Sequence, residues 1–162
     1  MIVLKSQQEL TDYLDFMGDD IVVFMFSSAL KDRLNTMINT KFADLAEVLS
    51  KYTEKMRFLA YDLNVLGLHE HYEPDHPNMW LSKGNYRIGR PSLFRGDPHL
   101  EEMAEWLKYH AFNKFKMNTK DLDQRIDMAK YAKEQGINLN PKEKPRSIMD
   151  EVEQELMRRG EL

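Results

Sequence analysis

The apolar positions of this chain fall into short continuous runs separated by longer stripes of helical period. Residues 21–26 read Ile-Val-Val-Phe-Met-Phe without a polar interruption. A run of this length is typical of a central strand buried on both faces, so helices are expected on both sides of the sheet. Residues 58–61 form a second run of this kind. Further strands are expected in residues 1–5, 78–82 and 92–95.

Helical periodicity fills the segments between these strands. Ser6 and Glu9 have the spacing of a capping box, which predicts a first helix that ends near Gly18. A long amphipathic helix is predicted over residues 30–52. Asp97, followed by a proline, predicts the start of another helix as its N-cap. The stripe of the long helix consists of Leu30, Leu34, Ile38, Phe42, Leu45, Leu49 and Tyr52.

Length and charge narrow the classes of function. The 162 residues carry a formal net charge of −4 and suggest one domain with an appendage. This charge gives no basic face for nucleic acid, and no apolar run approaches the roughly 20 residues that span a bilayer. Residues 1–6 do not have the pattern of a secretory signal or an Arg-rich transit peptide. We therefore expect an intracellular protein, in the mitochondrion or the cytoplasm, that does not span a membrane.

The order of the predicted elements is strand–helix–strand–helix–strand–short helix–strand–strand–helix, and several segments resemble thioredoxin-like proteins. Residues 39–49 resemble the second helix of protein disulfide isomerase a-type domains, and residues 58–62 resemble their third strand. Residues 94–102 resemble the end of the last strand and the start of the last helix. The resemblance covers residues 1–112. It implies an α/β, thioredoxin-like fold, with a mixed sheet flanked by helices, and a helical extension over residues 113–162.

The motif that carries the chemistry of this family is absent. By the resemblance, its two cysteines would fall within residues 30–35, but the chain contains no cysteine. Thiol–disulfide exchange requires a thiolate nucleophile, so we expect a redox-inactive protein that is not an enzyme. The family's buried acid is also missing from residues 21–26. The degenerate active-site region is assigned to Ser27, Ser28, Leu30, Lys31 and Leu34, and the serines are interpreted as caps rather than nucleophiles.

Pro77 precedes a predicted strand that ends in a Lys-Gly-Asn turn, and it resembles the family's cis-proline. The resemblance implies that the peptide before this proline offers backbone groups to an extended polypeptide, as in strand addition. Peptide binding at His76-Pro77, beside residues 27–30, is therefore one interpretation. The other is that Pro77 only sets the geometry of a turn.

A histidine cluster precedes this proline. His69, His71 and His76 lie within eight residues and are three of the five histidines in the chain. Zinc or copper accepts imidazole ligands, so a metal site is one interpretation. The spacing matches no established closed site, and a solvated, pH-sensitive loop is the simpler interpretation. We predict no cofactor.

Residues 113–162 contain two amphipathic helical patterns joined by a Pro/Lys linker at 138–146. Segments of this size bury little core alone, so their apolar faces must pack on the parent domain or on another chain. The chain is therefore predicted to be a scaffold or accessory subunit of a larger protein complex, for which a mitochondrial complex is one setting. The alternative is a non-catalytic, isomerase-like chaperone domain that binds polypeptides. The predicted partner-binding residues are Leu122, Ile126, Met149, Val152 and Leu156.

Overall fold

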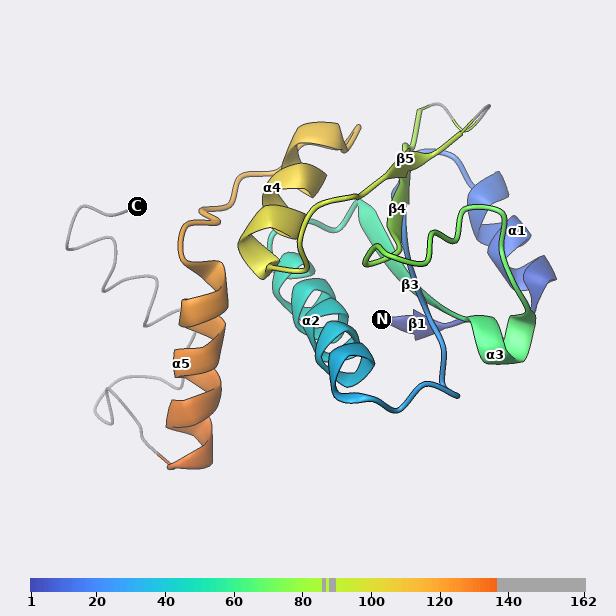
Figure 1. Ribbon diagram of the computed structural model, residues 1–162. Coiled ribbons are helices and arrows are strands. Elements are labelled where there is room, and N and C mark those ends of the chain that lie inside the picture. The colour runs from blue at the N-terminus through green and yellow to red at the C-terminus, as the bar shows by residue number, and fades with distance from the viewer. Residues whose placement is uncertain (86, 88–89, 137–162) are drawn as a thin grey trace. The chain divides into compact units, whose positions relative to one another are not determined.

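The computed structural model describes residues 1–136 except 86, 88 and 89, and the chain divides into two compact units, residues 1–117 and 118–162. The first unit contains the sheet and four of the described helices (Figure 1). Within the described residues, every helix is too short or too polar to cross a membrane.

The described strands of the first unit form one mixed sheet in the order β1–β3–β2–β4–β5. They are β1 (Ile2–Val3), β2 (Asp20–Phe26), β3 (Met56–Asp62), β4 (Met79–Ser82) and β5 (Ser92–Leu93). The central strand β2 runs parallel to β3 and antiparallel to β4. Phe26 at the end of β2 is therefore in register with Asp62 at the end of β3, so the two strands end at the same edge of the sheet.

Helices cover both faces of this sheet (Figure 1). On one side lie α1 (Gln7–Asp15) and α3 (Leu63–Leu66), and on the other lie α2 (Arg33–Leu49) and α4 (Leu100–His110). Alternate β2 side chains serve the two faces. Val23 packs in a core cluster with Leu10 and Trp80, whereas Phe24 stacks on Phe42 of α2 with ring centroids 4.5 Å apart. The prediction of a central strand buried on both faces is confirmed.

Two helix starts test the capping predictions. Ser6 caps α1, because its Oγ accepts the backbone N–H of Glu9 at 3.1 Å, as predicted. Asp97 does not cap α4: the helix begins at Leu100 after His99, and the Asp97 carbonyl accepts the His99 N–H at 2.8 Å in a preceding turn. The Asp-Pro pair therefore forms the approach to the helix rather than its first turn.

The central strand carries a buried carboxylate at its first residue, outside the run 21–26, which has no acid as the sequence indicated. β2 begins at Asp20, one residue before the predicted run, and Asp20 is fully buried. Its carboxylate accepts backbone N–H groups of Gly84 at 2.9 Å, Phe112 at 3.1 Å and Asn113 at 2.8 Å. Asp20 thus ties the segment after α4 to the sheet, and the first unit continues past the predicted boundary at 112 to Met117. This carboxylate lies at the opposite end of β2 from the loop that leads to α2.

Two glycines meet beside Asp20. The Gly18 N–H donates to the Gly84 carbonyl at 3.0 Å, and Gly18 has a φ of +112°, which favours glycine. A Cβ placed on Gly84 would lie 2.4 Å from the Gly18 carbonyl oxygen. Only glycine fits at position 84 without displacing this backbone.

The second unit is described over residues 118–136. Its helix α5 spans Leu122–Glu134 and corresponds to the first of the two amphipathic helical patterns predicted within residues 113–162. Leu122 and Ile126 are buried, whereas Met128 and Tyr131 of the same helix are exposed. The role of Leu122 and Ile126 in partner binding stays a prediction. The linker 138–146 and the predicted partner residues Met149, Val152 and Leu156 lie outside the described residues.

Candidate functional site

The loop between β2 and α2 holds the predicted degenerate active-site region. The Leu30 N–H donates to the Ser27 carbonyl at 3.2 Å, which closes a tight turn directly after the strand. Lys31 follows in the loop with an exposed side chain. The helix then begins at Arg33, three residues later than the start of the predicted stripe, so Leu30 lies outside the helix.

Asp62 organises this loop from the neighbouring strand. Its Oδ1 accepts the backbone N–H of Ser28 at 3.0 Å and that of Asn64 at 2.9 Å. The Asn64 side-chain amide donates to the Ser28 hydroxyl at 3.4 Å. The parallel register of β2 and β3 brings these residues together. Ser28 is therefore a structural residue held by Asp62, which agrees with its interpretation as a cap rather than a nucleophile.

The Asp62 carboxylate is held in its charged form. Burial works to raise the pKa of Asp62, but hydrogen bonds from the Ser28 hydroxyl and from the backbone N–H groups of Ser28, Asn64 and Val65 outweigh burial and lower it. A group ionised at neutral pH and already accepting these hydrogen bonds is poorly suited to act as a general acid or base.

A second carboxylate occupies the helix end at which a family member would place its thiolate. Asp32 is the N-cap of α2, and its Oδ1 accepts the Asn35 N–H at 2.8 Å. This backbone hydrogen bond, followed by one from the Asn35 side chain, lowers the pKa of Asp32. The positive end of the helix dipole thus stabilises a fixed carboxylate, and no reactive group takes its place.

Apolar side chains project from the same end of α2. Leu30 is 50% exposed, Leu34 is 60% exposed and Met37 is 45% exposed. The sequence prediction assigned Leu30 and Leu34 to the buried stripe of the helix. That assignment is wrong, because the buried part of the stripe begins at Phe42. We call Leu30, Leu34 and Met37 the apolar end of α2.

The predicted cis-proline is wrong, because the described peptide bonds, including the one before Pro77, are all trans. Asn78 makes the turn into β4 instead, with φ at +61°, a conformation that Asn tolerates better than most residues. Its Oδ1 accepts the Glu73 N–H at 2.7 Å, and its Nδ2 donates to the His76 carbonyl at 2.9 Å. These two bonds hold the turn that the resemblance assigned to Pro77.

The backbone groups of His76 are used inside the chain. Its N–H donates to the Pro74 carbonyl at 3.0 Å, and its carbonyl accepts the side chain of Asn78. A peptide ledge at His76-Pro77 would need these two groups free to pair with an extended polypeptide. The observed turn therefore favours the interpretation in which Pro77 belongs to a turn.

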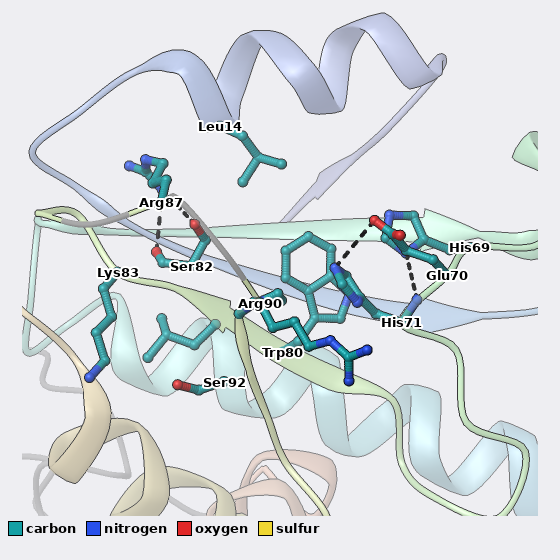
Figure 2. A pocket seen from close by; sticks show the side chains of 12 residues that line it. Leu14, His69, Glu70, His71, Trp80, Ser82, Lys83, Arg87, Arg90 and Ser92 are labelled. Atoms are coloured by element: carbon teal, nitrogen blue, oxygen red, sulfur yellow. Dashed lines mark hydrogen bonds and ion pairs between the residues drawn. The ribbon is translucent and has the colours of Figure 1, made fainter.

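The histidine cluster does not converge on one metal. His69 and His71 have ring centroids 4.9 Å apart and both contact Trp80 (Figure 2). His76 instead pairs with Glu73 at 3.6 Å. Among the described residues, no three His, Asp or Glu side chains come together in a metal-binding group. The three-histidine metal site is therefore wrong. Burial is the main cause that lowers the pKa of both His69 and His71.

Sequence reasoning missed the residues that hold these loops in place. Asp62 was interpreted only as the end of a strand, and Asn78 only as the start of one. Two signals were available: Asp62 directly follows a predicted strand, and Asn78 directly follows a proline. Asp and Asn are favoured in turns and at helix ends, so both positions could have been predicted to hold a loop. Their hydrogen-bond partners are distant in sequence or lie in irregular loops, and no periodicity reveals these.

A scan against protein-family models and a search of curated proteins find no match for this chain. Solved structures do match in fold. The zinc-bound form of human ERp44 matches at 15% identity with a TM-score of 0.52, over 67% of this chain and 30% of that one. The thioredoxin of Fasciola hepatica matches at 18% identity with a TM-score of 0.50, over 68% of this chain and 99% of that one.

The germline-specific thioredoxin Deadhead of Drosophila melanogaster matches at 15% identity with a TM-score of 0.50, over 68% of this chain and all of that one. This chain spans less than a third of the ERp44 chain but nearly the whole of each thioredoxin. The chain thus has a thioredoxin-like fold, as the sequence predicted. Because it has no cysteine, it cannot perform thiol–disulfide exchange through a thiol of its own.

Proposed function

We propose that this chain is a redox-inactive, thioredoxin-like subunit that binds a protein partner in a larger assembly. The observation that carries this proposal is the apolar end of α2, where Leu30, Leu34 and Met37 are about half exposed. Leu30 and Leu34 lie within residues 30–35, where the resemblance places the family's two cysteines. Exposed apolar groups that gather in one region are typical of protein interaction sites.

The polar groups beside these side chains support a binding role over catalysis. Asp62 and Asp32 are ionised and engaged in hydrogen bonds with their own loop and helix. A loop held in this way presents the apolar end of α2 in a fixed conformation, which lowers the entropic cost of association. The C-terminal helical segment supplies a second docking surface in this proposal.

The alternative proposal, a chaperone domain that binds many polypeptides, has weaker support. Strand addition beside Pro77 would require the backbone of His76, which is occupied by Pro74 and Asn78. A partner of fixed identity and stoichiometry fits the apolar end of α2 better. Location in the mitochondrion or the cytoplasm is a separate part of the proposal and is checked by cell fractionation.

Native co-purification with quantitative mass spectrometry tests the proposal. The full chain is compared with the triple variant Leu30→Ser, Leu34→Ser, Met37→Ser. A matched control changes exposed apolar residues elsewhere, Phe16→Ser and Met17→Ser. We expect one partner at constant stoichiometry with the full chain and the control, and its loss with the triple variant.

A second variant separates the two docking surfaces. It carries Met149→Ser, Val152→Ser and Leu156→Ser in the otherwise full chain. Loss of the partner in this variant alone would assign docking to the C-terminal segment and contradict the role of the apolar end of α2. Capture of many unrelated unfolded proteins, with no constant partner, would favour the chaperone alternative.

A further inference from the structure

A pocket of about 360 Å³ opens on the face of the sheet that α1 covers (Figure 2). Leu14 of α1, the loop after α3, strand β4 and the start of β5 line it. None of its lining residues belongs to the degenerate active-site region. Its size lies near the lower end of the range of about 300–1,000 Å³ found for small-molecule sites.

Two buried nitrogen donors belong to residues that line this pocket and have no partner within the described part of the chain. They are Nε1 of Trp80 and Nε of Arg87. Trp80 as a whole is only 2% exposed. Buried N–H groups are nearly always hydrogen-bonded, so an unpaired one at a cavity points to an acceptor supplied from outside.

The guanidinium of Arg87 is firmly held although its Nε is unpaired. Its Nη2 donates to the carbonyls of Phe16 and Asp19, each at 2.5 Å. Its Nη1 donates to the carbonyl of Ser82 at 3.2 Å and to the Ser82 hydroxyl at 3.3 Å. Arg87 thus fixes one end of the pocket by joining the α1–β2 connection to β4.

Flat rings form the other end. The His69 ring stacks on Trp80 with centroids 5.5 Å apart, and the His71 ring meets Trp80 edge-on at 5.4 Å. Leu14 and Pro91 add apolar surface to the lining. Figure 2 shows His71, Trp80 and Arg90 next to one another. Such a wall suits the flat, apolar body of a ligand.

The charges of the lining favour an anion. Lys83, Arg87 and Arg90 contribute positive charge, and Glu70 is the one carboxylate among the lining residues. His71 is less basic than usual, mainly through burial and partly through repulsion from Arg90. At neutral pH the imidazoles are therefore uncharged, and the arginines and the lysine supply the positive potential.

We propose that this pocket binds a small, planar organic acid. The ring of the ligand lies against Trp80 and His71, and its acid group accepts the indole N–H of Trp80 and pairs with Arg90. The unpaired indole N–H of Trp80, the flat apolar wall and the positively charged rim then have one common explanation. No covalent step is involved.

Titration followed by ¹H–¹⁵N NMR tests this site, because the chain has only two tryptophans and therefore two indole N–H signals. The variant Trp106→Phe assigns the signal of Trp80. The probes are 2-naphthoate, the neutral 2-naphthalenemethanol and inorganic phosphate. We expect 2-naphthoate to shift the Trp80 indole signal saturably and to bind about 10-fold or more tightly than the neutral alcohol, because a charge-assisted hydrogen bond is lost in the alcohol.

Two arginine variants provide the matched comparison. Arg90→Gln is expected to weaken 2-naphthoate binding about 10-fold, whereas Arg33→Gln, which removes an exposed arginine outside the pocket, changes it less than about 2-fold. The remaining amide signals report whether each variant is folded. The proposal is overturned by a Trp80 signal that no probe shifts saturably, by equal binding of acid and alcohol, by phosphate binding as tight as that of 2-naphthoate, or by unchanged binding in Arg90→Gln.

Discussion

The degenerate active-site region and the Trp80 pocket differ in how their buried polar groups are satisfied. At the end of β2, Asp62 accepts hydrogen bonds from Ser28 and Asn64 within the same loops. In the pocket, the indole nitrogen of Trp80 and the Nε of Arg87 have no partner in the described part of the chain. In the region that the resemblance marks as functional, Asp62 finds its hydrogen-bond partners within the chain. In the pocket, which the resemblance does not mark, two buried donors lack such partners.

This difference separates a region that can bind a partner only through its apolar side chains from a pocket that still has unpaired hydrogen-bond donors. Where donors and acceptors pair inside the chain, a ligand would have to break existing hydrogen bonds before making its own. Where a buried donor has no partner, a ligand that supplies the acceptor gains the full hydrogen bond. The polar groups at the end of β2 are thus paired within the chain, while a different face of the sheet keeps unpaired ones.

The largest expected effect comes from Asp20, which is more deeply buried than Asp62. Asp20→Ala would leave the N–H groups of Gly84, Phe112 and Asn113 without an acceptor. We expect the free energy of unfolding to fall by about 4 kcal/mol, measured by urea denaturation of the full chain. Asp20→Asn retains one acceptor oxygen and should lose clearly less. An equal loss in the two variants would mean that hydrogen bonding is not the cause.

Asp62→Ala tests whether the degenerate region is held from within. The substitution removes the acceptor of the Ser28 and Asn64 N–H groups. We expect a loss of about 2 kcal/mol in the free energy of unfolding, smaller than for Asp20 because these N–H groups lie nearer to water. A loss similar to that of an exposed control such as Asp12→Ala would contradict the comparison.

Trp80→Phe tests the other side of the comparison. The substitution removes an unpaired donor and keeps an aromatic ring against His69 and His71. Relief of the unsatisfied N–H offsets part of the lost packing, so the unfolding free energy should change by only about 1 kcal/mol or less. A loss as large as that of Asp62→Ala would contradict this expectation.

The smallest effect is a pH dependence from the histidines of the pocket. Burial lowers the pKa of His69 and His71 below 6.5, so the unfolded chain binds more protons than the folded one under mildly acidic conditions. The contribution of these two histidines to the free energy of unfolding is therefore fully present above pH 6.5. It is lost as the pH falls from 6.5 through their lowered pKa values in the folded chain. The double variant His69→Gln, His71→Gln should flatten this part of the unfolding curve.

His110 provides the control, because burial also lowers its pKa and it lies outside the pocket. His110→Gln should remove a separate part of the acid sensitivity and leave the contribution of the double variant unchanged. Non-additive effects of the two changes would place His110 in the same titrating group as the pocket.

The sequence predicted most of the fold, because its strands are local apolar runs. Residues 21–26 could only be a buried strand, and Ser6 with Glu9 marked a helix start by spacing alone. The long stripe was extended too far, since Leu30 and Leu34 keep the helical period but have no core beneath them. Periodicity records which residues could share a face, and burial depends on what else packs there.

The candidate sites were less accessible to sequence reasoning. Pro77 was assigned a cis bond by resemblance, and the hydrogen bonds of Asn78 that replace it join residues in an irregular turn. Trp80 stands out because its buried indole N–H has no acceptor nearby in the described part of the chain. A sequence pattern does not show which atoms surround a side chain in the fold. In the sequence, Asp62 looks like any residue at the end of a strand. Its role becomes visible only in the structure, where the register of β2 and β3 brings Ser28 to its carboxylate.

The contact between Gly18 and Gly84 has a consequence for tracing the ancestry of this chain. A thioredoxin-like chain without cysteines cannot be recognised by a Cys-x-x-Cys motif, so chains like it need another signature. Particular residue types are favoured here regardless of function, because a Cβ on Gly84 would meet Gly18, Gly18 has a positive φ, and the Asn113 side-chain amide donates to the Gly18 carbonyl and to Asp20. A search for Gly-x-Asp before an apolar strand, with the distant glycine and asparagine in place, would find chains of the same fold by its architecture.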